Sequence, residues 1–160
     1  MTSPTRALTS RGPPDPGGAE ARARFRIARF IMEAGVKLGL GSAALATACG
    51  SFHAFVAAVA PGDPPDRYLV AAAALFVAAK AQGTPRRARD VLNVTLRISP
   101  HVPPRCLQPG SAPPALDGNF WGLRDSLLQC ELLLLRVLRF RLPLEHPHKY
   151  LLQYLLALGR

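Results

Sequence analysis

Two charged residues stand alone in otherwise apolar stretches of the sequence. Lys80 is the only charge between Arg67 and Arg86. Glu131 lies in a run of leucines, and at 100° per residue several of them fall within about 60° of it on a helix. The leucines on this face are Leu127, Leu128, Leu134, Leu135 and Leu138.

The chemistry available to these two charges is ionic. A carboxylate or an ammonium group that is withdrawn from water costs several kcal/mol unless it is paired and hydrogen-bonded. Lys80 and Glu131 are therefore predicted to make a specific contact, either with each other or with a partner that docks there. The alternative is a purely internal ion pair, or charged ends that reach out to water.

Other chemistry finds less support in the sequence. The motifs GxGxxG, GxxxxGK[ST], HEXXH and GxSxG do not occur, so no catalytic residue and no cofactor are expected. His146 and His148 flank Pro147 but have no cysteine or acid at ligand spacing, so no metal site is expected either.

Arginines gather in two short stretches. They could contact phosphates, but no aromatic residues or recognised motif accompany them, and a solvated face is the favoured interpretation. The two groups are Arg22, Arg24, Arg26 and Arg29, and Arg86, Arg87 and Arg89.

The elements that must position these residues are helices. Apolar residues recur at helical spacing, and no strand pattern of useful length occurs. The helix at 67–82 is apolar on all sides, which is typical of a helix buried among others, and Asp66 is placed to cap it. Helices are expected at about 22–38, 43–60 with Ser42 as cap, 67–82, 84–98, from Asp117 or Asn119 to Phe140, and from near Pro147 onwards.

Composition limits the class of protein. A chain of 160 residues suits one compact domain, and residues 1–20 have the composition of a flexible tail. The net charge of +10 favours acidic partners. The three cysteines lack CxxC spacing, and the longest apolar run, 68–79, is far below the ~20 residues that span a bilayer. An intracellular protein in a reducing compartment is expected.

Several long runs resemble the cyclin Q type of cyclin, over about residues 22–158. The runs are 25–35, Asp125-Ser126, 129–133, 136–140 and 146–152. The resemblance implies an all-α cyclin box, a bundle of five helices in which the third is buried at the centre. It divides the chain into the tail 1–20, a cyclin box over 21–142, and 143–160 as the first helix of an incomplete second box.

The resemblance also implies a function and a site. In this family, a lysine late in the third helix and a glutamate in the fifth grip the mobile regulatory helix of a protein kinase. Lys80 and Glu131 occupy these positions, and Leu135, Phe140 and Leu142 match apolar positions of the same interface. The chain is thus expected to be a kinase-activating subunit, not an enzyme, located in the nucleus or cytoplasm. The implied partner is cyclin-dependent kinase ten, with a role in transcription or growth control and with no small-molecule substrate or membrane contact.

The sequence departs from the cyclin pattern after Lys80, where Ala81-Gln82-Gly83 replaces an apolar residue and an acidic pair. The methionine-containing substrate-docking patch of cell-cycle cyclins is not matched in the first helix. Two alternatives stay open: a nucleic-acid or transcription-complex module of cyclin-box fold, or a shortened form with impaired activity.

Overall fold

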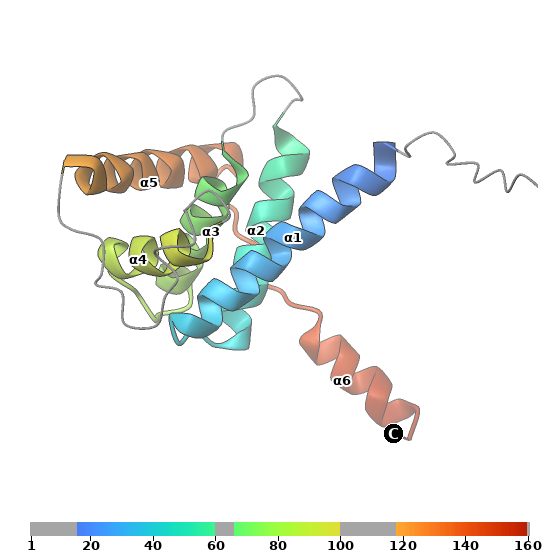
Figure 1. Cartoon of the computed structure of the whole chain (residues 1–160). Helices are drawn as coiled ribbons and strands as arrows, with labels where there is room; N and C mark the ends of the chain where they lie inside the picture. Colours follow the sequence, from blue (N-terminus) through green and yellow to red (C-terminus); the bar gives the residue numbers. More distant parts are fainter. Residues whose placement is uncertain (1–15, 60–65, 100–117, 160) are drawn as a thin grey trace, which may run out of the picture.

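The computed structural model describes residues 16–59, 66–99 and 118–159, and within them it contains six helices and no strand (Figure 1). The predicted all-α fold is confirmed. One of the three cysteines, Cys106, lies outside the described residues, as do Asp117, one of the two predicted starts of the fifth helix, and most of the predicted tail. The helices are α1 (Pro16–Lys37), α2 (Ser42–Ala58), α3 (Arg67–Ala81), α4 (Ala88–Ile98), α5 (Gly118–Val137) and α6 (His148–Ala157).

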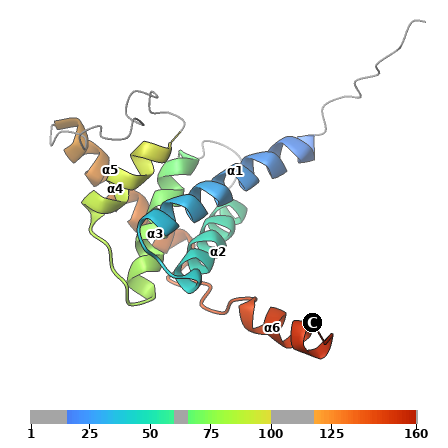
Figure 2. The same cartoon turned by 60° about the horizontal axis from the view of Figure 1, so that its bottom comes forward.

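Helix α3 forms the centre of the molecule, as its apolar sequence predicts. Every residue from Val70 to Ala79 is buried, and α3 contacts α1, α2, α4 and α5 (Figures 1 and 2). Its many alanines let these four helices approach closely, because a small side chain keeps the helix axes near one another. The predicted cap is confirmed, since the side chain of Asp66 accepts a hydrogen bond from the backbone N–H of Tyr68.

Helix α1 packs on this centre through one face, which carries Ile27, Phe30, Ile31 and Ala34. Beside that face, Gly35 allows α2 to come very near. A Cβ atom at Gly35 would lie 1.9 Å from Cδ2 of Leu45. The absence of a side chain at this position therefore leaves room for the side chain of Leu45 of α2 against α1.

The first two helices begin at other residues than the sequence predicts. Helix α1 starts at Pro16 and not near residue 22. Proline suits the first position of a helix, and Glu20 anchors the early turns because it accepts hydrogen bonds from Arg24 and from Arg67 of α3. For α2, the N-cap is Gly41, and Ser42, the predicted cap, is the first helical residue.

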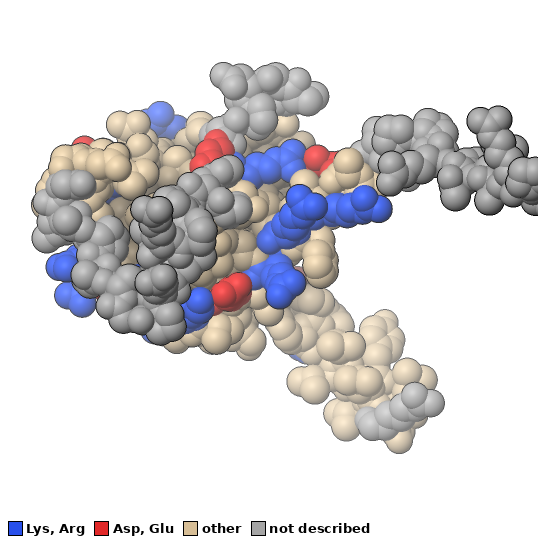
Figure 3. Space-filling view, in the orientation of Figure 1, with Lys and Arg blue, Asp and Glu red and all other residues tan. Residues whose placement is uncertain are grey.

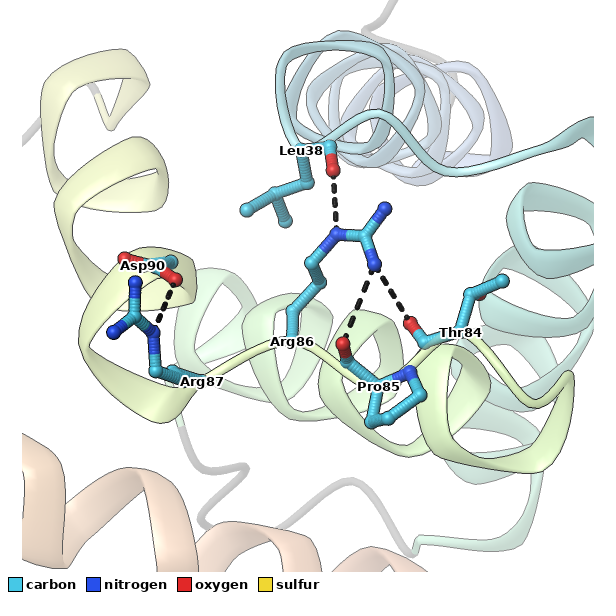
Figure 4. Close-up of polar contacts among 6 residues, drawn as sticks. All are labelled: Leu38, Thr84, Pro85, Arg86, Arg87 and Asp90. Atoms are coloured by element: carbon cyan, nitrogen blue, oxygen red, sulfur yellow. Dashed lines mark hydrogen bonds and ion pairs between the residues drawn. The ribbon is translucent and has the colours of Figure 1, made fainter.

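Helix α4 begins at Ala88 and not at the predicted Thr84-Pro85. The reason is that the side chain of Arg86 binds the end of α1. Its guanidinium group donates a hydrogen bond to the carbonyl oxygen of Leu38 (2.7 Å; Figure 4), at the C-terminal end of α1, and another to that of Gly39 (3.1 Å). It also donates to the carbonyls of its own neighbours Thr84 and Pro85. A cation that satisfies the last carbonyls of one helix thus holds residues 84–87 in a non-helical connection.

Helix α6 lies apart from the five-helix body and points away from it in both views (Figures 1 and 2). It makes no contact with any other described helix, and each of its residues is exposed. The predicted final helix is therefore present, but its apolar side chains have no partner among the described residues.

Candidate functional site

The two isolated charges meet at the junction of α3 and α5. Lys80 stands in the last turn of α3, and its Nζ donates a hydrogen bond to Oε1 of Glu131 on α5. The ammonium group also lies 4.1 Å from the centre of the Phe76 ring, which suits a cation–π contact. The sequence left open whether Lys80 and Glu131 contact each other or a partner. The structure shows that they contact each other.

The two partners differ in their access to solvent. The side chain of Glu131 is only 11% exposed, whereas that of Lys80 is 44% exposed. The pair therefore lies at the edge of the core, with its carboxylate covered and its ammonium group within reach of another molecule. Removing the cation would leave a covered carboxylate unpaired, at a cost of about 1–3 kcal/mol, less than for a fully buried pair.

Apolar side chains surround this pair on α5. Leu135 is half-buried against the core, one turn beyond Glu131. Two further leucines were not predicted as site residues: Leu128, which is also half-buried, and Leu132, which is exposed. Spacings of four and three residues place Leu128, Leu132 and Leu135 in one strip beside Glu131, so the same helical count could have identified them.

The end of α5 is unusual in its backbone. The helix was predicted to reach Phe140 but ends at Val137, and Arg139 (φ 52°) and Phe140 (φ 57°) are left-handed. The N–H of Phe140 donates to the carbonyl of Leu135 (2.8 Å) and closes the helix end. Glycine normally takes this conformation, which costs other residues roughly 1–2 kcal/mol. Phe140 is also 69% exposed, so its ring gains little from burial in this structure.

The chain after Phe140 is fastened to the body. Leu142 is half-buried against the core, and Pro143 lies so close to α2 that a Cβ atom at Gly50 would come within 2.9 Å of its Cγ. Three residues further on, Nε2 of His146 lies 3.1 Å from Oγ1 of Thr47. Residues 142–146 therefore fix the direction in which the chain leaves the body.

The tautomer of His146 follows from the hydrogen bonds of Thr47. The single hydroxyl proton of Thr47 is donated to the carbonyl of Ala43 (3.0 Å), and Gln82 Nε2 donates to Oγ1 (3.1 Å). Oγ1 can then only accept from His146, so Nε2 of His146 carries a proton. Among the described residues, no group of three or more histidine, cysteine or acidic side chains could hold a metal ion.

The arginines that the sequence grouped together have different surroundings. Arg86 binds backbone carbonyls, and Arg87 pairs with Asp90 (3.1 Å; Figure 4). Arg24 and Arg67 share Glu20, and their hydrogen bonds hold the pKa of that carboxyl below its ordinary value. Three arginines of the two groups, Arg24, Arg86 and Arg87, are therefore engaged in contacts within the chain.

Comparison with known proteins identifies the family of this helical body. Residues 12–143 match the family described as "Cyclin, N-terminal domain". The chain belongs to the cyclin family. Cyclins are regulatory subunits and not themselves enzymes, and the predicted cyclin-box fold is confirmed. No helix among the described residues is long and apolar enough to cross a membrane.

Several cyclins of known name are similar in sequence. Cyclin-K of Danio rerio is 33% identical over 135 residues, which make up 84% of this chain and 29% of that protein. Cyclin-L1 of Homo sapiens is 30% identical over 140 residues, 88% of this chain and 26% of that protein. Cyclin pch1 of Schizosaccharomyces pombe is 29% identical over 132 residues, 82% of this chain and 36% of that protein. The chain therefore spans only about a third of these relatives or less.

Proposed function

We propose that this cyclin binds and activates a cyclin-dependent kinase through a surface that contains Lys80, Glu131, Leu135, Phe140 and Leu142. The observation that carries the proposal is the ion pair between α3 and α5, with its carboxylate covered and its ammonium group half-exposed. The chain itself is expected to have no catalytic activity.

The pair is suited to bind a charged helix of a partner. Lys80 and Glu131 hold each other in place before binding, so little side-chain freedom is lost when a partner arrives. The ammonium group of Lys80 has further hydrogen-bonding capacity, because it carries three donors. Exposed Leu132 beside the pair adds apolar surface that a partner can cover.

Phe140 supports the same interface by a different argument. A large aromatic side chain stands here in a left-handed conformation, with its ring in water. Both features are unfavourable for the chain alone. Strained residues of this kind gather at functional sites, and an exposed aromatic ring is a typical anchor of a protein interface.

Activation would act through the position of the kinase's regulatory helix. A protein kinase is active only when an ion pair between a strand lysine and a glutamate of that helix is in place, together with its magnesium-binding segment. A rigid surface on α3 and α5 would hold the helix in this arrangement and so shift the kinase towards its active state.

The finer assignments of this proposal rest on the sequence resemblance. We propose that the chain is of the cyclin Q type, that its kinase is cyclin-dependent kinase ten, and that it works in the nucleus or the cytoplasm in transcription or growth control. Residues 143–160 would be the first helix of a second box, and 21–142 the first box.

The test is co-purification of the chain with kinase ten from cells that express both, followed by a phosphotransfer assay. Lys80→Met keeps an unbranched stem over Phe76 but removes the charge, and is expected to lower kinase recovery at least tenfold. The matched control is Lys37→Met, which breaks an exposed Lys–Glu pair on α1 and is expected to leave recovery unchanged.

Recovery is compared per folded molecule, because Lys80→Met also weakens the body. Equal recovery with Lys80→Met and with the unchanged chain would contradict the proposed site. Phosphotransfer by the chain without a kinase would contradict the proposed function. Sequence-selective DNA binding at about 150 mM salt, without kinase recovery, would favour the nucleic-acid alternative.

A further inference from the structure

Helix α1 carries a second face with regularly spaced side chains, opposite the face that packs on the body. Residues 22, 25, 29, 32 and 36 follow one another at spacings of three, four, three and four, which places them on one line along the helix. This line extends for about 21 Å at 1.5 Å per residue. We call it the outer ridge of α1, and it consists of Arg22, Phe25, Arg29, Met32 and Val36.

The outer ridge combines exposed apolar side chains with free positive charge. Phe25, Met32 and Val36 are 69%, 48% and 67% exposed. Within the described parts of the chain, neither Arg22 nor Arg29 has an ion pair or a side-chain hydrogen bond. Figure 3 shows that Lys and Arg side chains gather over α1 on the face in view.

The neighbouring charges of α1 behave differently. Arg24 is paired with Glu20, and Lys37 is paired with Glu33. The acids of this helix thus neutralise cations outside the ridge and leave the two ridge arginines uncompensated. A surface of this kind is complementary to a partner that brings both negative charge and apolar side chains.

We propose that the outer ridge of α1 docks an acidic amphipathic helix of another protein. Spacings of three and four are those at which two helices interlock along a common line. The leucines or similar residues of such a helix would cover Phe25, Met32 and Val36, while its acids would meet Arg22 and Arg29. A nucleic acid fits less well, because Met32 and Val36 offer no stacking surface and phosphates would leave both in water.

This proposal does not depend on the kinase-binding proposal, because the ridge and the Lys80–Glu131 pair stand on different helices. The probe is a labelled peptide of about 15 residues, four turns of helix, with leucines at three–four spacing and glutamates between them. A second peptide has lysine in place of every glutamate. Binding is measured by fluorescence anisotropy with the whole chain, and a DNA duplex is titrated separately.

The decisive variant is the charge reversal R22E/R29E, and its matched control is R89E/R97E on the exposed surface of α4, with the same change of net charge. The acidic peptide is expected to bind the unchanged chain and the control alike, and R22E/R29E at least tenfold more weakly. Phe25→Ser is also expected to weaken binding, without a change in thermal stability, because its side chain is exposed.

Three results would overturn the proposal. The first is no binding of the acidic peptide at about 1 mM, the limit of a weak specific contact. The second is an equal loss of affinity in R22E/R29E and R89E/R97E, or equal binding of the lysine peptide. The third is DNA that binds through the ridge arginines while the acidic peptide does not.

Discussion

Helices α3 and α6 are both rich in apolar residues, yet among the described helices α3 is the most buried and α6 is fully exposed. Residues 70–79 of α3 are buried without exception, and six of the ten are alanine. In α6, leucines and tyrosines occur at similar density, and none is buried. Apolar content alone therefore does not decide burial.

The difference lies in the size of the side chains and in the available neighbours. Small side chains on all sides of α3 let four helices approach it together. The large side chains of α6 would need a matching surface of their own, and the body α1–α5 offers none that α6 reaches. Exposed apolar area of this kind marks an interaction surface or favours association.

The largest effect that separates the two helices should come from enlarging one alanine in each. Ala74→Leu adds a branched side chain at a position that is 0% exposed, and it is expected to cost about 1–3 kcal/mol or more of unfolding free energy. Ala157→Leu on α6 is expected to change it by less than about 0.5 kcal/mol. Urea denaturation measures both, and a similar cost at the two sites would contradict the difference in packing.

A second prediction concerns the thiol of Cys130, which is buried in the five-helix body. Burial, and less so the charge of Asp66, raises its pKa from 9.0 to about 11. Between these values the unfolded chain loses the proton while the folded chain keeps it, so stability falls as the pH rises, by about 3 kcal/mol at most. Unfolding free energies of the unchanged chain and of Cys130→Ala, measured from pH 8 to about pH 11, should diverge in slope. Parallel curves would show that the thiol is not desolvated.

Residues 142–146 connect the five-helix body to α6, and a smaller change in stability is expected where they contact α2. Alanine in place of glycine inside a helix normally stabilises by about 1 kcal/mol, and Gly122→Ala on α5, with open space around it, should show this gain. Gly50→Ala should not, because its Cβ would press on Pro143. Thermal melting of both variants is the measurement. An equal gain would mean that residues 142–146 are not held against α2.

The smallest effect is expected from removing α6 altogether. A chain that ends at Pro147 keeps His146 on Thr47 and loses only residues without helix contacts. Its unfolding free energy should change by less than about 0.5 kcal/mol, while its tendency to aggregate should fall, as light scattering would show. Loss of cooperative unfolding would instead make α6 part of the core.

Much of this fold could be predicted from the sequence. The buried central helix follows from residues that are apolar on all sides, and its start follows from Asp66. The starts of α1 and α4 could not be predicted, because they depend on contacts between distant residues. Glu20 is held by Arg67 of another helix, and Arg86 reaches the end of α1.

The candidate site was predictable in part. Helical spacing shows that Lys80 and Glu131 are isolated charges among apolar residues. Each of them is therefore expected to contact a charged or hydrogen-bonding group. Spacing does not tell which of the two reaches solvent, since that depends on how α3 and α5 are packed. The left-handed backbone at Phe140 was not predictable, because aromatic residues rarely adopt it.

The most direct test of the proposed kinase-binding surface compares glycine at two adjacent left-handed residues. Phe140→Gly and Arg139→Gly both relieve backbone strain, so each is expected to leave the fold as stable or about 1 kcal/mol more stable. Only Phe140→Gly removes the exposed ring, so it alone should weaken binding of the kinase, at least tenfold, in a titration with purified proteins. Unchanged affinity of a stable Phe140→Gly chain, or an equal loss in Arg139→Gly, would contradict the proposed surface.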